Sequence, residues 1–124
     1  MARRARLWLP PLTYMAIIFA LSAQSNPLPA VTARVWDKLL HLMEYGGLAF
    51  LLARALVGDG RSWRAALVGA TLLASAYGAT DEYHQSFVPG RDSSARDWSA
   101  DSLGAIVGVS AYAAAQWRSK PTPD

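Results

Sequence analysis

Three long stretches of this 124-residue chain contain no charged side chain: residues 7–33, 65–80 and 102–117. A further stretch, 39–57, is apolar apart from a few titratable residues. A helix needs about 20 mostly apolar residues to cross the hydrocarbon core of a membrane. We therefore predict an all-α fold, a transmembrane four-helix bundle that forms one domain over residues 1–124. The expected spans are 7–23, 39–57, 65–80 and 102–117.

A soluble four-helix bundle is the alternative, and each of its helices should have a polar face that repeats every 3.6 residues. Segment 65–80 has no such face, because its polar members are only small hydroxyl residues and one tyrosine. The tryptophans also favour a membrane, since they lie near the predicted helix ends, where interfacial belts form. They are Trp8, Trp36, Trp63, Trp98 and Trp117.

Composition excludes several functional classes. The chain has no cysteine, so it has no disulfide, thiolate metal site or cysteine nucleophile. The net charge of +3 is too small to indicate nucleic-acid binding. No HExxH, Gly-rich phosphate loop or serine elbow is present. The expected partner is therefore the lipid bilayer, with no nucleic acid.

Lysine and arginine placement predicts the orientation, since cytoplasmic loops are enriched in these residues. A cytoplasmic N-terminus puts eight of the twelve on the inside: Arg3, Arg4, Arg6, Arg54, Arg61, Arg64, Arg118 and Lys120. The four on the outside are Arg34, Lys38, Arg91 and Arg96. We therefore expect a multi-pass protein of the cell membrane with both termini cytoplasmic. A cleaved signal peptide over the first segment is the alternative, and it leaves three spans.

In this orientation, both histidines and seven of the nine carboxylates lie near the outer face. Spacings of three, four and seven residues place side chains on one face of a helix. The residues that share a face in this way are Asp37, His41 and Glu44, then Asp81, His84 and Gln85, then Asp97 and Asp101. The last of these faces continues through Gly104 and Gly108, and small residues let membrane helices approach closely. We therefore expect these polar faces to converge on one outward-facing pocket.

Several short motifs carry a family resemblance. They are DKLLHLMEY over 37–45, DEYHQ over 81–85 and FVPGR over 87–91, followed by Asp97 and Gly104. In this order and spacing, residues 36–108 closely resemble the VanZ-like family, which is named for a protein linked to teicoplanin resistance. The resemblance implies a small four-span membrane protein of the cell envelope, with a role in antibiotic (glycopeptide) susceptibility. Family members typically have asparagine four residues after the helix-four aspartate, where this chain has Asp101.

The polar residues suggest chemistry at this pocket. Candidate general acids and bases are His41, Glu44, Asp81 and His84. Candidate substrate-binding residues are Asp37, Glu82, Gln85, Arg91, Asp97 and Asp101. Arg91 can hold a phosphate or a carboxylate in a bidentate way. The expected ligand is a lipid-linked cell-wall precursor or a phospholipid head group, which lies at this depth of the membrane.

Three other readings stay open, and the sequence does not decide whether the chain is an enzyme. One is a divalent metal held by His41, Glu44 and His84, since imidazole and carboxylate groups suit such ions. Another is a haem between the two histidines. In the third, the cluster is non-catalytic and either locks the helices together or binds a partner.

Overall fold

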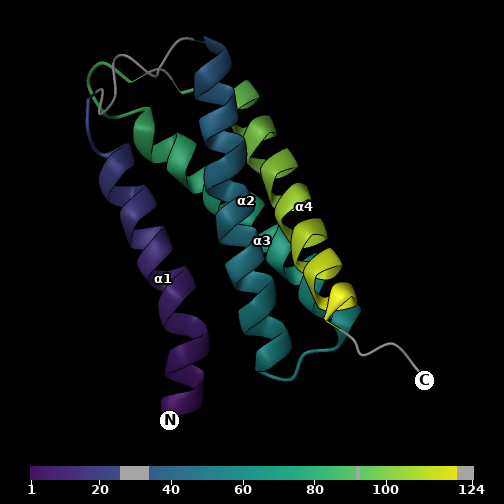
Figure 1. Cartoon of the computed structure of the whole chain (residues 1–124). Coiled ribbons are helices and arrows are strands. Elements are labelled where there is room, and N and C mark those ends of the chain that lie inside the picture. The colour runs from purple at the N-terminus through teal and green to yellow at the C-terminus, as the bar shows by residue number, and fades with distance from the viewer. Residues whose placement is uncertain (26–33, 92, 120–124) are drawn as a thin grey trace, which may run out of the picture.

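The computed structural model describes residues 1–25, 34–91 and 93–119, and this part of the chain is all helical (Figure 1). The helices are α1 (Ala2–Ser22), α2 (Arg34–Gly58), α3 (Trp63–Gln85) and α4 (Ala95–Arg118). The predicted all-α bundle is thus confirmed. Each predicted span falls within one helix, except that Ala23 forms the C-cap of α1. The helices are longer than the apolar segments, since the charged residues that flank these segments are also helical.

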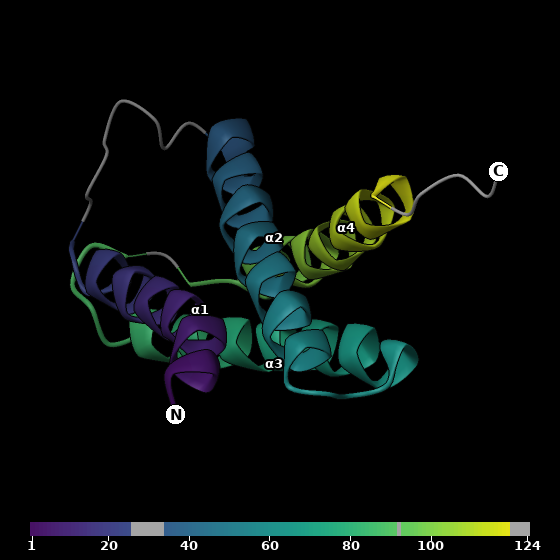
Figure 2. The same cartoon turned by 60° about the horizontal axis from the view of Figure 1, so that its bottom comes forward.

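Helix α2 is the centre of the bundle and contacts each of the other three helices, α4 most extensively. Figures 1 and 2 show α2 between α1 and α4, with α3 crossing on one side of them. Hydrogen bonds tie α3 to its neighbours: the Tyr77 hydroxyl donates to the Met15 carbonyl (2.7 Å), and the Trp98 indole donates to the Ser75 carbonyl (2.9 Å). The crossing therefore brings the second half of α3 toward both α1 and the start of α4.

Small residues permit the close contact between α2 and α4. A Cβ atom on Gly104 would overlap the backbone carbonyl of Leu42, and one on Gly108 would overlap that of Gly46. Close backbone approach of this kind is a common way for membrane helices to associate. The stripe of small residues on α4 thus fixes the side that meets α2, and it places Asp97 and Asp101 on the buried side, 4% and 0% exposed.

Large apolar side chains cover the outside of all four helices. Those more than 45% exposed include Leu12 and Phe19 on α1, Met43 on α2, Val68 and Leu72 on α3, and Leu103 and Ile106 on α4. In the described part of the chain, two helical segments, Ala2–Ser22 and Asp37–Gly58, are long and apolar enough to cross a membrane. Helices α3 and α4 are not among them, because charged ends and several Gly and Ser residues lower their mean hydropathy.

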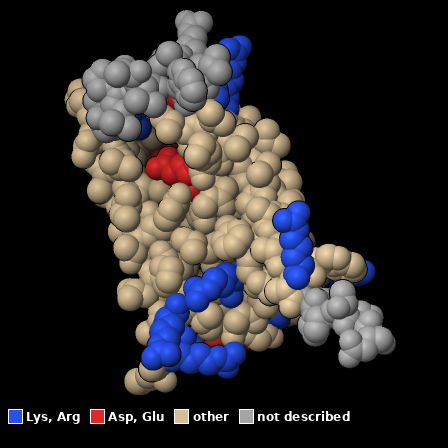
Figure 3. Space-filling view, in the orientation of Figure 1, with Lys and Arg blue, Asp and Glu red and all other residues tan. Residues whose placement is uncertain are grey.

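The two ends of the bundle differ in charge (Figure 3). At the lower end, Arg3 donates to the Gly58 carbonyl (2.7 Å) and Arg4 pairs with Asp59 (2.9 Å), so the start of α1 is bound to the turn after α2. At the other end, α2 and α4 begin while α1 and α3 finish, and the acidic residues gather there. Ser94 caps α4 by accepting from the Asp97 amide, which fixes where this helix begins.

Candidate functional site

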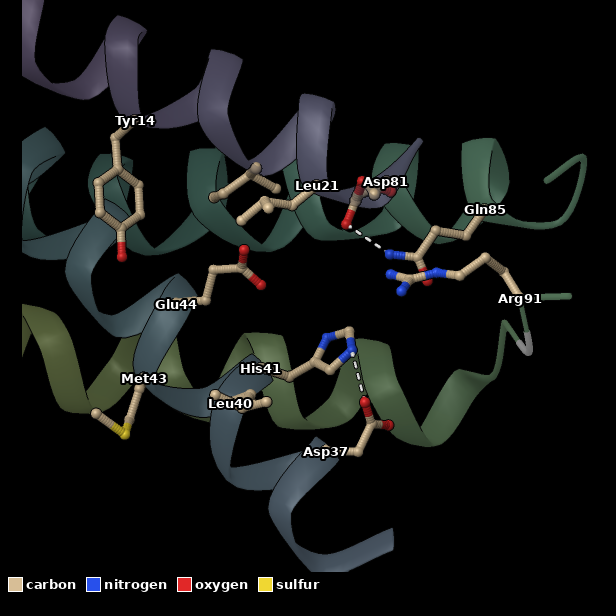
Figure 4. A pocket seen from close by; sticks show the side chains of 12 residues that line it. Tyr14, Leu21, Asp37, Leu40, His41, Met43, Glu44, Asp81, Gln85 and Arg91 are labelled. Atoms are coloured by element: carbon tan, nitrogen blue, oxygen red, sulfur yellow. Dashed lines mark hydrogen bonds and ion pairs between the residues drawn. The ribbon is translucent and has the colours of Figure 1, made fainter. Parts of the chain in front are cut away.

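A pocket of about 330 Å³ lies among α1, α2, α3 and the chain after α3 (Figure 4). Its lining residues are Tyr14, Ile18, Leu21, Ser22, Asp37, Leu40, His41, Met43, Glu44, Asp81, Gln85 and Arg91. Aliphatic side chains line part of the wall, while titratable groups from α2, α3 and Arg91 line the rest. The pocket is therefore amphipathic and brings together residues that are distant in the sequence.

His41 is the polar centre of the site, since carboxylates from three helices surround its ring. Its Nδ1 atom lies 2.7 Å from Asp101 Oδ1 and 3.9 Å from Glu82 Oε1. Its Nε2 atom lies 4.0 Å from Asp37 Oδ1, one turn earlier on the same helix. Asp101 therefore fixes the ring through Nδ1 without lining the pocket itself, while the ring of His41 does line the pocket.

Glu82 and Asp97 connect α3, α2 and the start of α4. Glu82 accepts a hydrogen bond from the Ser94 amide (3.0 Å), so it satisfies a backbone donor at the N-cap of α4. Lys38 forms an ion pair with Asp97, which is 4% exposed. These contacts place the start of α4 beside His41 and leave the second oxygen of Glu82 without a hydrogen-bond partner among the described residues.

Asp81 and Gln85 form the α3 wall of the pocket. The Gln85 amide donates to Asp81 Oδ2 (3.1 Å) across one helical turn, and both residues are buried. Arg91 follows the turn after α3, where Gly90 has a φ of +78° and where an added Cβ atom would lie 3.2 Å from the Ser25 carbonyl oxygen. Glycine suits this positive φ because it has no Cβ atom. The turn thus brings the Arg91 guanidinium to the pocket (Figure 4).

The structure divides the predicted site residues into three groups. Those that line the pocket are Asp37, His41, Glu44, Asp81, Gln85 and Arg91. Those that lie behind or beside His41 without lining it are Glu82, Asp97 and Asp101. His84 stands apart, because its ring stacks on Phe19 with the ring centres 4.5 Å apart.

The arrangement also shows which residues could hold a metal ion. Among the described residues, two groups have suitably close ligand atoms: Asp37 with His41 and Asp97, and His41 with Glu82 and Asp101. Neither group includes Glu44 or His84, so the ligand set predicted from the sequence does not coincide with them. His41 is the shared member of both groups.

Two polar pocket residues were missed by the sequence reasoning, and both lie on α1. Tyr14 points its hydroxyl into the pocket near Glu44 (Figure 4). Ser22 is 2% exposed, and its hydroxyl has no hydrogen-bond partner among the described residues. Their only signal in the sequence is that they are polar residues within an apolar segment, which does not separate a pocket residue from an ordinary helix residue.

Charge determines what the pocket can bind. Asp37, Glu44 and Asp81 supply carboxylates, while Arg91 supplies a guanidinium and His41 an imidazole. Carboxylates accept from ammonium groups, and arginine binds phosphate in a bidentate way. Together with the aliphatic wall, these groups match a ligand that has an amine, an anion and an apolar part.

The comparisons with known proteins agree with the motifs on α2 and α3. The model of the VanZ/LLP1 family matches residues 3–116, which extends the resemblance to all four helices. No curated protein and no solved structure matches the chain. Since the family match covers nearly the whole chain, the predicted assignment is confirmed. The chain belongs to the VanZ/LLP1 family, which with its two apolar helices indicates a membrane protein.

Proposed function

We propose that this chain is a four-span protein of the cell membrane whose pocket opens to the extracytoplasmic side. There it binds the head group of an envelope lipid or lipid-linked cell-wall precursor that carries both an amine and a phosphate. The observation that carries this proposal is the amphipathic pocket, in which Arg91 and three carboxylates meet beside an aliphatic wall.

The exposed apolar side chains of α3 and α4 support four spans. Leu72 is 64% exposed and Ile106 is 52% exposed, although each lies near the middle of its helix. Apolar surface on every helix is unfavourable in water and favourable against lipid tails. The positive-inside rule assigns the arginine-rich end to the cytoplasm, and the pocket end to the opposite side.

Topology reporters test this orientation. Alkaline phosphatase fused within the 86–94 connection is expected to be active, because this enzyme folds only outside the cytoplasm. The same enzyme fused after Gly60 or after the C-terminus is expected to be inactive, while a fluorescent protein at the C-terminus is expected to fluoresce. Phosphatase activity after Gly60 and none in the 86–94 connection would overturn the orientation.

Head-group binding is tested with purified full-length protein and defined lipids. Phosphatidylethanolamine supplies the amine and phosphate, phosphatidylglycerol lacks the amine, and native mass spectrometry measures retention of each lipid. We expect the wild type to retain phosphatidylethanolamine in preference to phosphatidylglycerol. Equal retention of the two lipids would contradict recognition of the amine by the carboxylates. If a lipid-linked cell-wall precursor is the natural ligand, it is expected to displace phosphatidylethanolamine at lower concentration than any phospholipid.

The Arg91→Met variant is expected to weaken phosphatidylethanolamine binding by about 10-fold or more, because a charge-assisted hydrogen bond contributes about 1.5–3 kcal/mol. The matched control is Arg96→Met, since Arg96 is exposed on α4 and does not line the pocket. Equal binding by the Arg91→Met, Arg96→Met and wild-type proteins would remove Arg91 from the proposed site.

If the binding affects glycopeptide action, cells that carry Arg91→Met are expected to show the teicoplanin susceptibility of cells that lack the chain.

The His41–Asp101 pair favours a second candidate function, namely acid–base chemistry on the bound lipid. A buried carboxylate that accepts from one imidazole nitrogen orients the ring and leaves the other nitrogen free to exchange protons with a ligand. Here, Asp101 holds Nδ1 while the ring borders the pocket. Mass spectrometry of phosphatidylethanolamine incubated with the protein tests this function, which predicts release or modification of the head group. An unchanged lipid leaves binding as the function.

A further inference from the structure

Behind the pocket, His41, Glu82 and Asp101 form a buried group with one member on each of α2, α3 and α4. Their side chains are almost inaccessible, since the three residues are 7%, 8% and 0% exposed. One ligand atom from each residue lies within 4.8 Å of the other two. This group is distinct from the pocket lining, to which only His41 belongs.

The charges of this group are not balanced by the described residues. Within 4.0 Å, His41 is the basic partner of both Glu82 and Asp101, and in the described part of the chain no lysine or arginine joins them. Lys38 instead pairs with Asp97 and approaches Asp37. Two buried carboxylates that share one imidazole retain negative charge, and burying such charge is unfavourable unless a cation or a proton neutralises it.

Unpartnered oxygens in the same group point to a ligand. Ser94 binds only the Oε2 atom of Glu82, and the buried Oε1 atom has no hydrogen-bond partner among the described residues. That Oε1 atom faces His41, at 3.9 Å from Nδ1. Asp101 likewise has one oxygen on His41 and a second, buried oxygen without a partner. Buried polar atoms are nearly always satisfied in folded proteins, so the Glu82 Oε1 atom, which faces His41, indicates that a bound group completes the site.

The distances suit a small divalent ion. Tetrahedral zinc bonds of about 2.0–2.1 Å separate neighbouring ligand atoms by about 3.3 Å. The two distances from His41 Nδ1, 2.7 Å to Asp101 and 3.9 Å to Glu82, lie on either side of that value. One imidazole nitrogen with two carboxylates suits zinc or manganese and leaves coordination positions open for water.

We propose that His41, Glu82 and Asp101 bind one divalent transition-metal ion, with zinc as the first candidate. The ion would take the place of the proton shared by His41 Nδ1 and Asp101 Oδ1, so binding releases that proton to solvent. It would join α2, α3 and α4 at one point. The other metal group, Asp37 with His41 and Asp97, is the poorer candidate because the Lys38 ammonium already occupies Asp97.

The test uses full-length protein in detergent, stripped with a chelator, equilibrated with zinc chloride, desalted and analysed for metal. The wild type is expected to retain about one zinc per chain. The Glu82→Gln and Asp101→Asn variants are expected to bind at least 10-fold more weakly in calorimetric titrations. Glu44→Gln and His84→Gln are matched controls that are expected to retain zinc, because neither residue belongs to the group.

A second measurement does not depend on any variant. Titrations of the wild type in buffers with different ionisation enthalpies are expected to show release of about one proton per zinc bound. Zinc is also expected to raise the Tm of the wild type but not that of Glu82→Gln.

Far less than one zinc per folded wild-type chain would overturn the proposal, as would wild-type affinity in Glu82→Gln. Loss of zinc in Glu44→Gln with retention in Glu82→Gln would assign the ion to the pocket instead. None of these measurements involves lipid. A failure of the metal proposal therefore leaves the proposed lipid binding untouched, and a failure of lipid binding leaves the metal site untouched.

Discussion

Replacement of Gly104 or Gly108 by alanine is expected to separate α2 from α4 and to destabilise the bundle severely. At both positions, the added Cβ atom would overlap a backbone carbonyl of α2, which no side-chain rotation can relieve. Overpacking in a close-packed interior usually costs about 1–3 kcal/mol, and a clash with backbone lies at or above the top of that range. Since α2 contacts all the other helices, the damage is expected to spread through the whole bundle.

The measurement is thermal unfolding of each variant in detergent, together with its yield from membranes. We expect a Tm lower by about 10 °C or more, and a reduced yield of monodisperse protein. The matched control is Gly69→Ala on α3, whose added Cβ atom would meet only the Leu56 side chain, at 3.4 Å. Alanine is a better helix former than glycine, so this control is expected to be neutral or slightly stabilising. Wild-type stability of Gly104→Ala would show that the two helices pack less closely than described.

The helices could be predicted from the sequence because long stretches without charged residues coincide with them. Charged groups are excluded from a membrane interior, so the uncharged stretches such as 65–80 give the approximate positions of the helices. Periodicity also predicted the buried side of α4, since Asp97, Asp101, Gly104 and Gly108 share one face. Both inferences depend on local spacing, which a sequence records directly.

The pairing inside the site could not be predicted in the same way. Spacing placed His84 on one face with Asp81, but the ring stacks on Phe19 of α1, and its position depends on how α3 crosses α1. Likewise, three carboxylates from three helices lie near His41, and only the rotation of α4 selects Asp101 as its hydrogen-bond acceptor. Such contacts depend on crossing angles and helix rotation, which are tertiary features without a signal in one sequence.

The His41–Asp101 hydrogen bond is expected to stabilise the bundle more than any other polar contact at this end. Asp101 is fully buried, and its carboxylate accepts from His41 at 2.7 Å. Asp101→Ala would remove the acceptor, leave His41 without that partner and open a space beside Gly78 and Tyr45. Breaking a buried pair by removing one partner costs about 3–5 kcal/mol. We therefore expect a Tm lower by about 10–20 °C in metal-free detergent solution.

Asp101→Asn separates the role of shape and hydrogen bonding from that of charge. The asparagine amide has nearly the volume of the carboxyl group, and its oxygen still accepts from the His41 Nδ1–H group. We therefore expect Asp101→Asn to lose no more than about a third of the Tm that Asp101→Ala loses. Asp59→Ala serves as a surface control: Asp59 pairs with Arg4, whose side chain is 78% exposed, so its loss is expected to cost less than about 1 kcal/mol. If Asp101→Ala were as stable as Asp59→Ala, the buried pair would not hold α2 to α4, and the glycine contacts alone would account for their packing.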